Sequence, residues 1–182
     1  MDLLAEAWGS IARAHPEASL VLVGPRKEDV GPTSGGDPFL ARVRESLFRS
    51  GAQDRVFMTG KVENVEDYLA VADVFVFPSR REGMPNVVAE AYACGVPTVM
   101  TPFVGLPEEF GRPGEEHLSV PHDPRQIVQA VDALLGDPAR RASLGRSGRS
   151  WAERELSLDR SLDSYERLYR ELAAAGRGPI VG

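Results

Sequence analysis

The stretch DVFVFPSRREGMPNVVAEAYACGVPTVMT, residues 73–101, alternates between two kinds of structure. Residues 73–79 and 96–102 are short apolar runs of the kind that form buried strands. Residues 86–94, between them, have the composition of a helix. A strand, a helix and a second strand in this order predict one unit of a parallel sheet.

The rest of the chain repeats this alternation. Helices are predicted at about residues 2–14, 39–50, 64–72 and 157–173, and strands at 18–24, 55–60 and 117–121. Residues 25–38 read as a loop, and two or three helices close the chain. The pattern predicts an α/β fold with a doubly wound, Rossmann-like parallel sheet flanked by helices. We expect one domain over residues 1–175 and a flexible tail at 176–182.

Composition and charge exclude several classes of protein. With 42% hydrophobic and 26% charged residues, the chain is typical of a soluble globular protein. Its net charge of −6 argues against a nucleic-acid-binding protein, which would normally be basic. No apolar run approaches the roughly 18–20 residues of a membrane span, so membrane association is not indicated. The single cysteine, Cys94, demands no oxidising compartment, and we expect a cytoplasmic protein.

Common catalytic signatures are missing from the sequence. It has no GxxxxGK[ST] phosphate loop, no GxGxxG fingerprint and no GxSxG elbow. His15, His117 and His122 are scattered and are interpreted as solvent-exposed loop residues, and no partners complete a metal site around His122 and Asp123. Cys94 is interpreted as a small buried residue rather than a nucleophile. We therefore expect neither a metal nor a cofactor.

Two glutamates, Glu82 and Glu90, are separated by seven residues. In a doubly wound sheet, ligands bind beyond the carboxyl ends of the strands. Glu82 follows a predicted strand, and Glu90 lies about one turn into the next helix, so both are expected at that edge. The whole edge comprises residues 24–25, 60–62, 78–86 and 101–107.

The start of the helix at 86–94 predicts an anion site. Pro85 suits a helix start and Asn86 is a good N-cap, so the amides of residues 84–88 would face the strand ends and could bind a phosphate. Glu90, among apolar neighbours, needs a partner, and the vicinal diol of a ribose offers two hydroxyl donors. Glu82 could accept from hydroxyls of a second ring beyond the phosphates.

A purely structural role for both glutamates is also open. Glu82 could pair with Arg80, Arg81 or another surface arginine, and Glu90 with a backbone amide or an arginine. The basic residues on or near the edge are interpreted as solvated surface charge; they are Arg26, Lys27, Arg80 and Arg81.

The stretch resembles the E-x7-E signature of family 4 glycosyltransferases, which have the GT-B fold. The pattern is matched at Pro78-Ser79, Glu82-Gly83, Pro85, Glu90-Ala91 and Gly95-Val96-Pro97. Residues 18–24, the segment that leads into the motif and the closing helices are also similar, so the resemblance covers nearly the whole chain. It implies the C-terminal, donor-binding lobe of a retaining, metal-independent glycosyltransferase of the hexosyltransferase type.

The resemblance also implies roles for individual residues. Glu90 would bind the ribose hydroxyls, and Glu82, the catalytic candidate, would bind the donor sugar. Lys61 and Val62 would lie near the base. The implied partner is a nucleotide-diphosphate sugar, whose sugar and base stay open. The diphosphate or sugar would meet the backbone of Gly83, Met84, Pro85, Asn86 and Val87.

The sequence departs from the family at its start. The family carries an Arg and a Lys ahead of the first helix seen here, at the end of a strand, and an N-terminal acceptor-binding lobe; none of these is in the sequence. We interpret the chain as a C-terminal fragment, or as a product begun at an internal methionine, and expect it to be inactive alone. The lost strand would be central, so two neighbouring strands would have unpaired edges. Val104-Gly105 replaces a Gly-Gly step of the family.

Two other functions are compatible with the same residues. One is a nucleotide-sugar epimerase of the same architecture, which would need acid and base groups on both lobes. The other is a degenerate lobe that keeps the fold without chemistry, which the intact glutamate pair disfavours.

Overall fold

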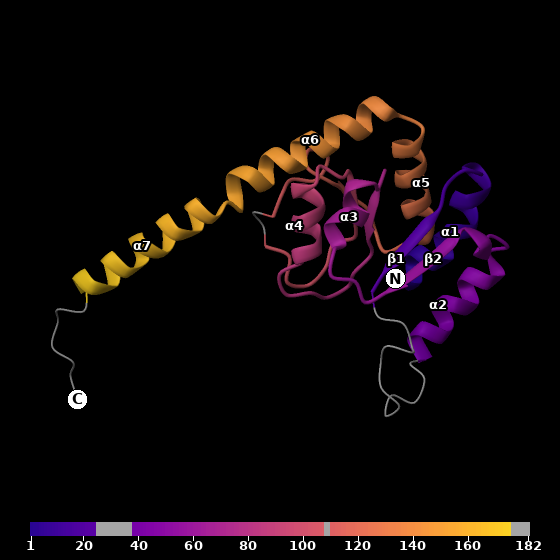
Figure 1. The fold of residues 1–182 in the computed structure, drawn as a ribbon, viewed down its shortest axis with the longest axis horizontal. Helices are drawn as coiled ribbons and strands as arrows, with labels where there is room; N and C mark the ends of the chain where they lie inside the picture. Colours follow the sequence, from indigo (N-terminus) through magenta and orange to yellow (C-terminus); the bar gives the residue numbers. More distant parts are fainter. Residues whose placement is uncertain (25–37, 108–109, 176–182) are drawn as a thin grey trace.

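The computed structural model describes residues 1–24, 38–107 and 110–175, and for residues 38–40 it describes the backbone alone. The helices are α1 (Asp2–Ala14), α2 (Pro38–Arg49), α3 (Val65–Ala70), α4 (Asn86–Ala93), α5 (Pro124–Leu135), α6 (Pro138–Glu155) and α7 (Leu158–Ala175). The strands are β1 (Leu20–Val23), β2 (Val56–Gly60), β3 (Phe75–Phe77), β4 (Thr98–Met100) and β5 (Leu118–Ser119). The predicted alternation is confirmed, with shorter strands (Figure 1). Apart from Pro38, the predicted loop at 25–38 lies outside the described residues, as does the tail at 176–182.

All strand pairs are parallel, as predicted, but the described strands form two sheets. One contains β1 and β2, and the other has the order β3-β4-β5. β1 and β3 each pair with a single neighbour, so each has one edge without a ladder partner among the described strands.

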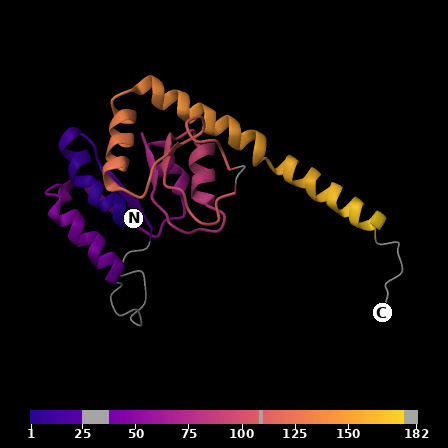
Figure 2. The same ribbon diagram turned by 180° about the vertical axis from the view of Figure 1, so that it is seen from behind.

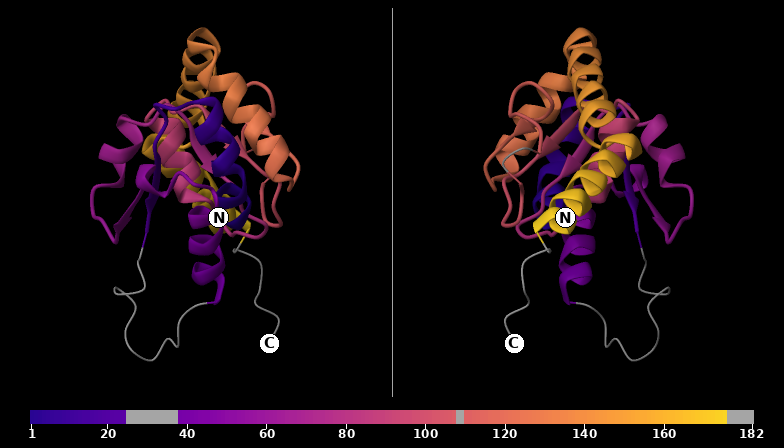
Figure 3. Two further views of the ribbon diagram at one scale, coloured as in Figure 1. Left: turned by 90° about the vertical axis from the view of Figure 1, so that its right-hand side faces the viewer. Right: turned by 90° about the vertical axis from the view of Figure 1, so that its left-hand side faces the viewer.

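One hydrophobic core joins the two sheets. Leu20 and Leu22 of β1 pack into the same cluster as Val99 of β4, together with Trp8 of α1 and Ile127 of α5. Helices α1 and α5 lie side by side over this cluster (Figure 3). The shared core therefore holds the two sheets together as one unit through side-chain packing.

A second core lies between α4 and α6. It is built around Val88 and Tyr92 of α4, Trp151 of α6 and Phe110. Helix α4 ends in a Schellman motif, in which the amides of Gly95 and Val96 bond to carbonyls in the last turn of α4. Gly95 adopts φ +73°, a left-handed conformation that favours glycine, so it ends α4 and turns the chain into β4.

Helix α7 extends away from the rest of the chain (Figures 1 and 2). Its predicted apolar stripe is present but has no buried residue. The exposed members are Leu158, Leu162, Tyr165, Leu168, Tyr169 and Leu172. In the described ranges, no helix combines the length and apolarity needed to cross a membrane.

Candidate functional site

The loops after β3 and β4 run side by side beyond the strands. The Glu82 amide donates to the Val104 carbonyl at 3.1 Å, and the Val104 amide donates to the Arg80 carbonyl at 3.1 Å. Parallel pairing thus continues past the strand ends, where Arg81 and Val104 form a bridge. This pairing fixes the backbone of Glu82 at the predicted edge.

Gly105 explains how closely these loops approach. A Cβ atom at Gly105 would lie 2.2 Å from the carbonyl oxygen of Glu82, a separation that real side chains do not adopt. Gly105 also has φ +100°, which other residues rarely take. The glycine of the Val104-Gly105 step is therefore required for the position of Glu82.

The side chain of Glu82 is oriented by a neighbour on its own loop. The Ser79 hydroxyl donates to Glu82 Oε1 at 2.7 Å. Arg80 and Arg81 are exposed, and neither forms an ion pair with Glu82 in the described structure. The alternative pairing of Glu82 with these arginines is therefore wrong for this conformation. The exposed Glu82 carboxylate has further acceptor capacity for a ligand.

The prediction that Asn86 is the N-cap of α4 is wrong. The N-cap is Pro85, without a side-chain capping bond, and Asn86 is the first helical residue. The amide of Asn86 donates to Met84 O and that of Val88 to Pro85 O, both at 2.9 Å, and proline has no N–H. Of the amides predicted to face an anion, those of Met84 and Val87 therefore keep no backbone partner among the described residues. The amide of Gly83, just before them, also has no backbone partner among the described residues.

Glu90 is exposed, contrary to the expectation that apolar neighbours bury it. It lies one turn into α4, and its carboxylate has no hydrogen bond or ion pair in the described part of the chain. No burial cost therefore demands a protein partner for Glu90. Its carboxylate is accessible to a ligand that reaches the start of α4.

Lys61 and Val62 follow β2, in the other sheet. Lys61 is exposed and Val62 is half-buried, and no hydrogen bond or ion pair within the described ranges links either to Glu82 or Glu90. Their predicted place near a base stays a prediction. Burial lowers the pKa of the Met1 amino group at the start of α1, with a smaller contribution in the same direction from the charge of Arg80.

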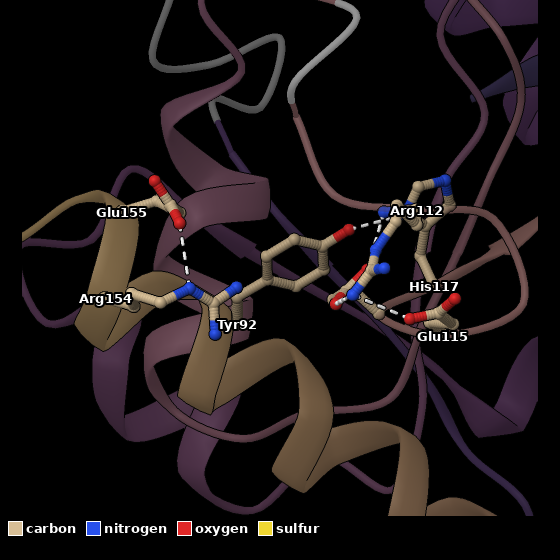
Figure 4. A network of polar contacts seen from close by, with 7 residues as sticks. Tyr92, Arg112, Glu115, His117, Arg154 and Glu155 are labelled. Carbon is tan, nitrogen blue, oxygen red and sulfur yellow. Dashed lines mark hydrogen bonds and ion pairs between the residues drawn. The ribbon is translucent and has the colours of Figure 1, made fainter.

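Buried polar side chains gather around Tyr92 of α4, and the sequence analysis did not predict them (Figure 4). The Tyr92 hydroxyl and His117 Nδ1 are 2.7 Å apart and share a buried hydrogen bond. Glu116, also buried, accepts from the backbone amide of Arg112 at 2.6 Å. Burial and the Glu116 charge raise the pKa of Tyr92, so its hydroxyl stays protonated.

The interpretation of the histidines as solvent-exposed loop residues is wrong for His117, which is 2% exposed. His15 and His122 are half-buried: His15 Nε2 lies 2.8 Å from Asp132, and His122 Nε2 lies 3.1 Å from the Ser79 carbonyl. Cys94 follows the last turn of α4 and is half-buried rather than fully buried. His117 begins the predicted strand at 117–121, but the apolar residues of that strand, Leu118 and Val120, alternate with it, so the pattern did not indicate its burial.

The fold should lose stability in acid through His117. Burial lowers the pKa of His117 below its ordinary value, against the smaller opposing effect of the Glu116 charge. Between the folded pKa and the unfolded value of about 6.5, the unfolded chain binds more protons. Stability is therefore complete above about pH 6.5 and is lost as the pH falls through the folded pKa. Urea unfolding between pH 7.5 and pH 5 gives the free energy of unfolding as a function of pH. This free energy should depend less on pH in His117→Asn, which keeps an acceptor for Tyr92, than in the wild type. An equal dependence in the two proteins would contradict the prediction.

Surface hollows occur elsewhere on the molecule. One is lined by residues of α1 and α2, and another lies at the junction of α6 and α7. Neither is lined by Glu82 or Glu90.

Comparison with known proteins places these features in a family. The family model "Glycosyl transferases group 1" matches residues 1–137. The GDP-mannose-dependent alpha-(1-6)-phosphatidylinositol monomannoside mannosyltransferase of Mycolicibacterium smegmatis is 33% identical over 162 residues, which are 83% of this chain and 39% of that protein. The chain spans less than half the length of the first curated relatives it matches.

Two solved structures have the same fold. The C-terminal domain of a glycosyl transferase group 1 family protein from Francisella tularensis matches with a TM-score of 0.73 and 18% identity, over 86% of this chain and 79% of that one. HepE of Anabaena, in complex with UDP-glucose, matches with a TM-score of 0.76 and 18% identity, over 94% of this chain and 44% of that one. The first agreement shows that this chain folds as a C-terminal lobe does.

Proposed function

Because this chain belongs to the group 1 glycosyl transferases, we propose that its strand edge is the donor site of a retaining glycosyltransferase. The donor is a nucleotide-diphosphate sugar. The observation that supports the proposal is that two exposed carboxylates, Glu82 and Glu90, flank the open amides at the start of α4 along the chain.

Each part of the site suits one part of such a donor. The carboxylate of Glu90 can accept from both hydroxyls of a ribose. The amides of Gly83, Met84 and Val87, at the positive end of the α4 dipole, suit the diphosphate without a metal. Glu82, held by Ser79, then accepts from hydroxyls of the transferred sugar. Lys61 and Val62 would border the base.

The residues of this chain would bind the donor in this proposal. Transfer also needs an acceptor, which in a two-lobed enzyme of this family would be bound by the other lobe. The mannosyltransferase relative is named as GDP-mannose-dependent and HepE is solved with UDP-glucose, so these two donors are the first to test.

Substitution of Glu90 is expected to weaken nucleotide binding by about 10- to 150-fold. Hydrogen bonds to a charged group contribute about 1.5–3 kcal/mol, and 1.4 kcal/mol corresponds to about tenfold in affinity. Calorimetric titration of the chain with UDP, GDP and ADP should give saturable binding of one nucleotide, and Glu90→Ala should lose most of it. Circular dichroism on the same samples monitors folding.

Glu171→Ala is the matched control, because Glu171 is also an exposed helical glutamate without a side-chain partner among the described residues and lies on α7. Its nucleotide affinity should equal that of the wild type. A folded chain that binds no nucleotide, or a Glu90→Ala variant that binds as tightly as the control, would contradict the proposed site and favour a lobe without donor-binding function.

A further inference from the structure

Ser79, two residues after β3, connects the ends of three strands. Its carbonyl oxygen accepts from Thr101 Oγ1 at 2.7 Å and from His122 Nε2 at 3.1 Å. Thr101 follows β4, and His122 lies three residues after β5. The hydroxyl of the same serine donates to Glu82 Oε1 at 2.7 Å. Ser79 therefore links the Glu82 carboxylate to groups from two neighbouring strand ends.

This link determines the orientation of Glu82. An exposed glutamate on a loop can sample many rotamers, and a hydroxyl with one proton selects one of them. The hydroxyl can select a rotamer only if the serine itself is fixed. Thr101, which is fully buried, and His122 fix it through its carbonyl from two sides.

The direction of the His122 bond follows from its partner. A carbonyl oxygen cannot donate, so His122 Nε2 must carry a proton and donate to Ser79. His122 is half-buried and follows β5, whereas Thr101 is fully buried. His122 can therefore be replaced with less disturbance of the core.

We propose that His122 is a positioning residue for Glu82, acting through the carbonyl of Ser79. Its ring N–H holds Ser79 so that the serine hydroxyl presents the Glu82 carboxylate in one orientation at the strand edge. The consequence for sugar binding rests on the proposed function, whereas the consequence for loop order does not.

Two variants separate the N–H donor from the bulk of the ring. His122→Gln places an amide N–H at nearly the reach of Nε2, and His122→Phe keeps a ring of similar size without the donor. The proposal predicts that Gln replaces the histidine and that Phe does not.

The first readout needs no ligand. Hydrogen exchange of the amides of Glu82 and Val104 reports the loop pairing beyond β3 and β4. In His122→Phe these amides should exchange about five- to tenfold faster, because one hydrogen bond to the preceding serine is lost. In His122→Gln they should exchange at the wild-type rate. The amides of β1 and β2, in the other sheet, report any global loss of stability and should be unaffected.

The second readout compares binding of the bare nucleotide with binding of the nucleotide sugar. Dissociation constants are measured for UDP against UDP-glucose and for GDP against GDP-mannose. His122→Phe should weaken binding of the nucleotide sugar about five- to tenfold and leave the bare nucleotide unchanged, since Glu82 is placed on the sugar. A general folding defect would weaken both equally.

Wild-type exchange rates at Glu82 and Val104 in His122→Phe would overturn the proposal, as would equally fast exchange in the Phe and Gln variants. If the wild type binds none of the four ligands, the donor-site proposal fails for this chain, and the exchange rates still decide the role of His122.

Discussion

Tyr92→Ala is expected to lower the free energy of unfolding by about 3–5 kcal/mol, the range for removing a large aromatic side chain from a core. Tyr92 has no exposed surface. Its ring stacks on Phe110 with the centroids 5.8 Å apart and meets Trp151 edge-on at 5.7 Å. Because these contacts join α4 to α6, truncation of Tyr92 leaves an internal cavity between the two helices.

The hydroxyl of Tyr92 adds a separate contribution. Tyr92→Phe keeps the ring but leaves the buried Nδ1 of His117 without its partner at 2.7 Å. An unsatisfied buried polar group costs about 1–3 kcal/mol, so the Phe variant should lie between the wild type and Tyr92→Ala.

Urea unfolding followed by circular dichroism measures these losses. Tyr165→Ala is the matched control, since Tyr165 is 59% exposed on α7 and its removal should change stability by no more than about 0.5 kcal/mol. Equal losses for Tyr92→Ala and Tyr165→Ala would show that the cluster between α4 and α6 is not a core.

The predictable part of the fold follows from local patterns. The unit β3-α4-β4 is marked by two apolar runs, an intervening helix and Gly95, whose left-handed conformation ends α4. The strand boundaries were predicted too wide because the apolar runs extend beyond the residues that pair in the ladder. Val74, for example, packs against the core but lies outside β3.

The less predictable part depends on contacts between distant segments. His117 alternates with the apolar residues Leu118 and Val120, and its buried hydrogen bond is to Tyr92 of α4, 25 residues away. The link from His122 to Ser79 spans 43 residues. The positions of Glu82 and Glu90 on the edge could be predicted from the strand-helix pattern, whereas the exposure of Glu90 and the open amides near it depend on how α4 begins.

Gly145→Ala is expected to destabilise the fold by about 1–3 kcal/mol, the usual cost of overpacking a core. Gly145 lies within α6, where replacing glycine by alanine normally stabilises a helix by about 0.5–1 kcal/mol. Here a Cβ atom would lie 2.1 Å from the carbonyl oxygen of Gly95 and 3.5 Å from Pro97 Cδ. Helix propensity and packing therefore predict changes of opposite sign.

Packing should prevail because the obstructing atom belongs to the backbone. The backbone amide of Gly95 donates a hydrogen bond to the Tyr92 carbonyl at 2.8 Å. The carbonyl of Gly95 therefore cannot move without disturbing the end of α4. The strain must then be relieved by moving α6 off α4, which opens the contacts of Trp151 with Tyr92. Ser150→Ala, at an exposed position of the same helix, isolates propensity and should change stability by no more than about 0.5 kcal/mol. Urea unfolding of the two variants measures the sign directly: a gain in stability for Gly145→Ala would mean that α6 does not approach Gly95 as closely as the fold requires.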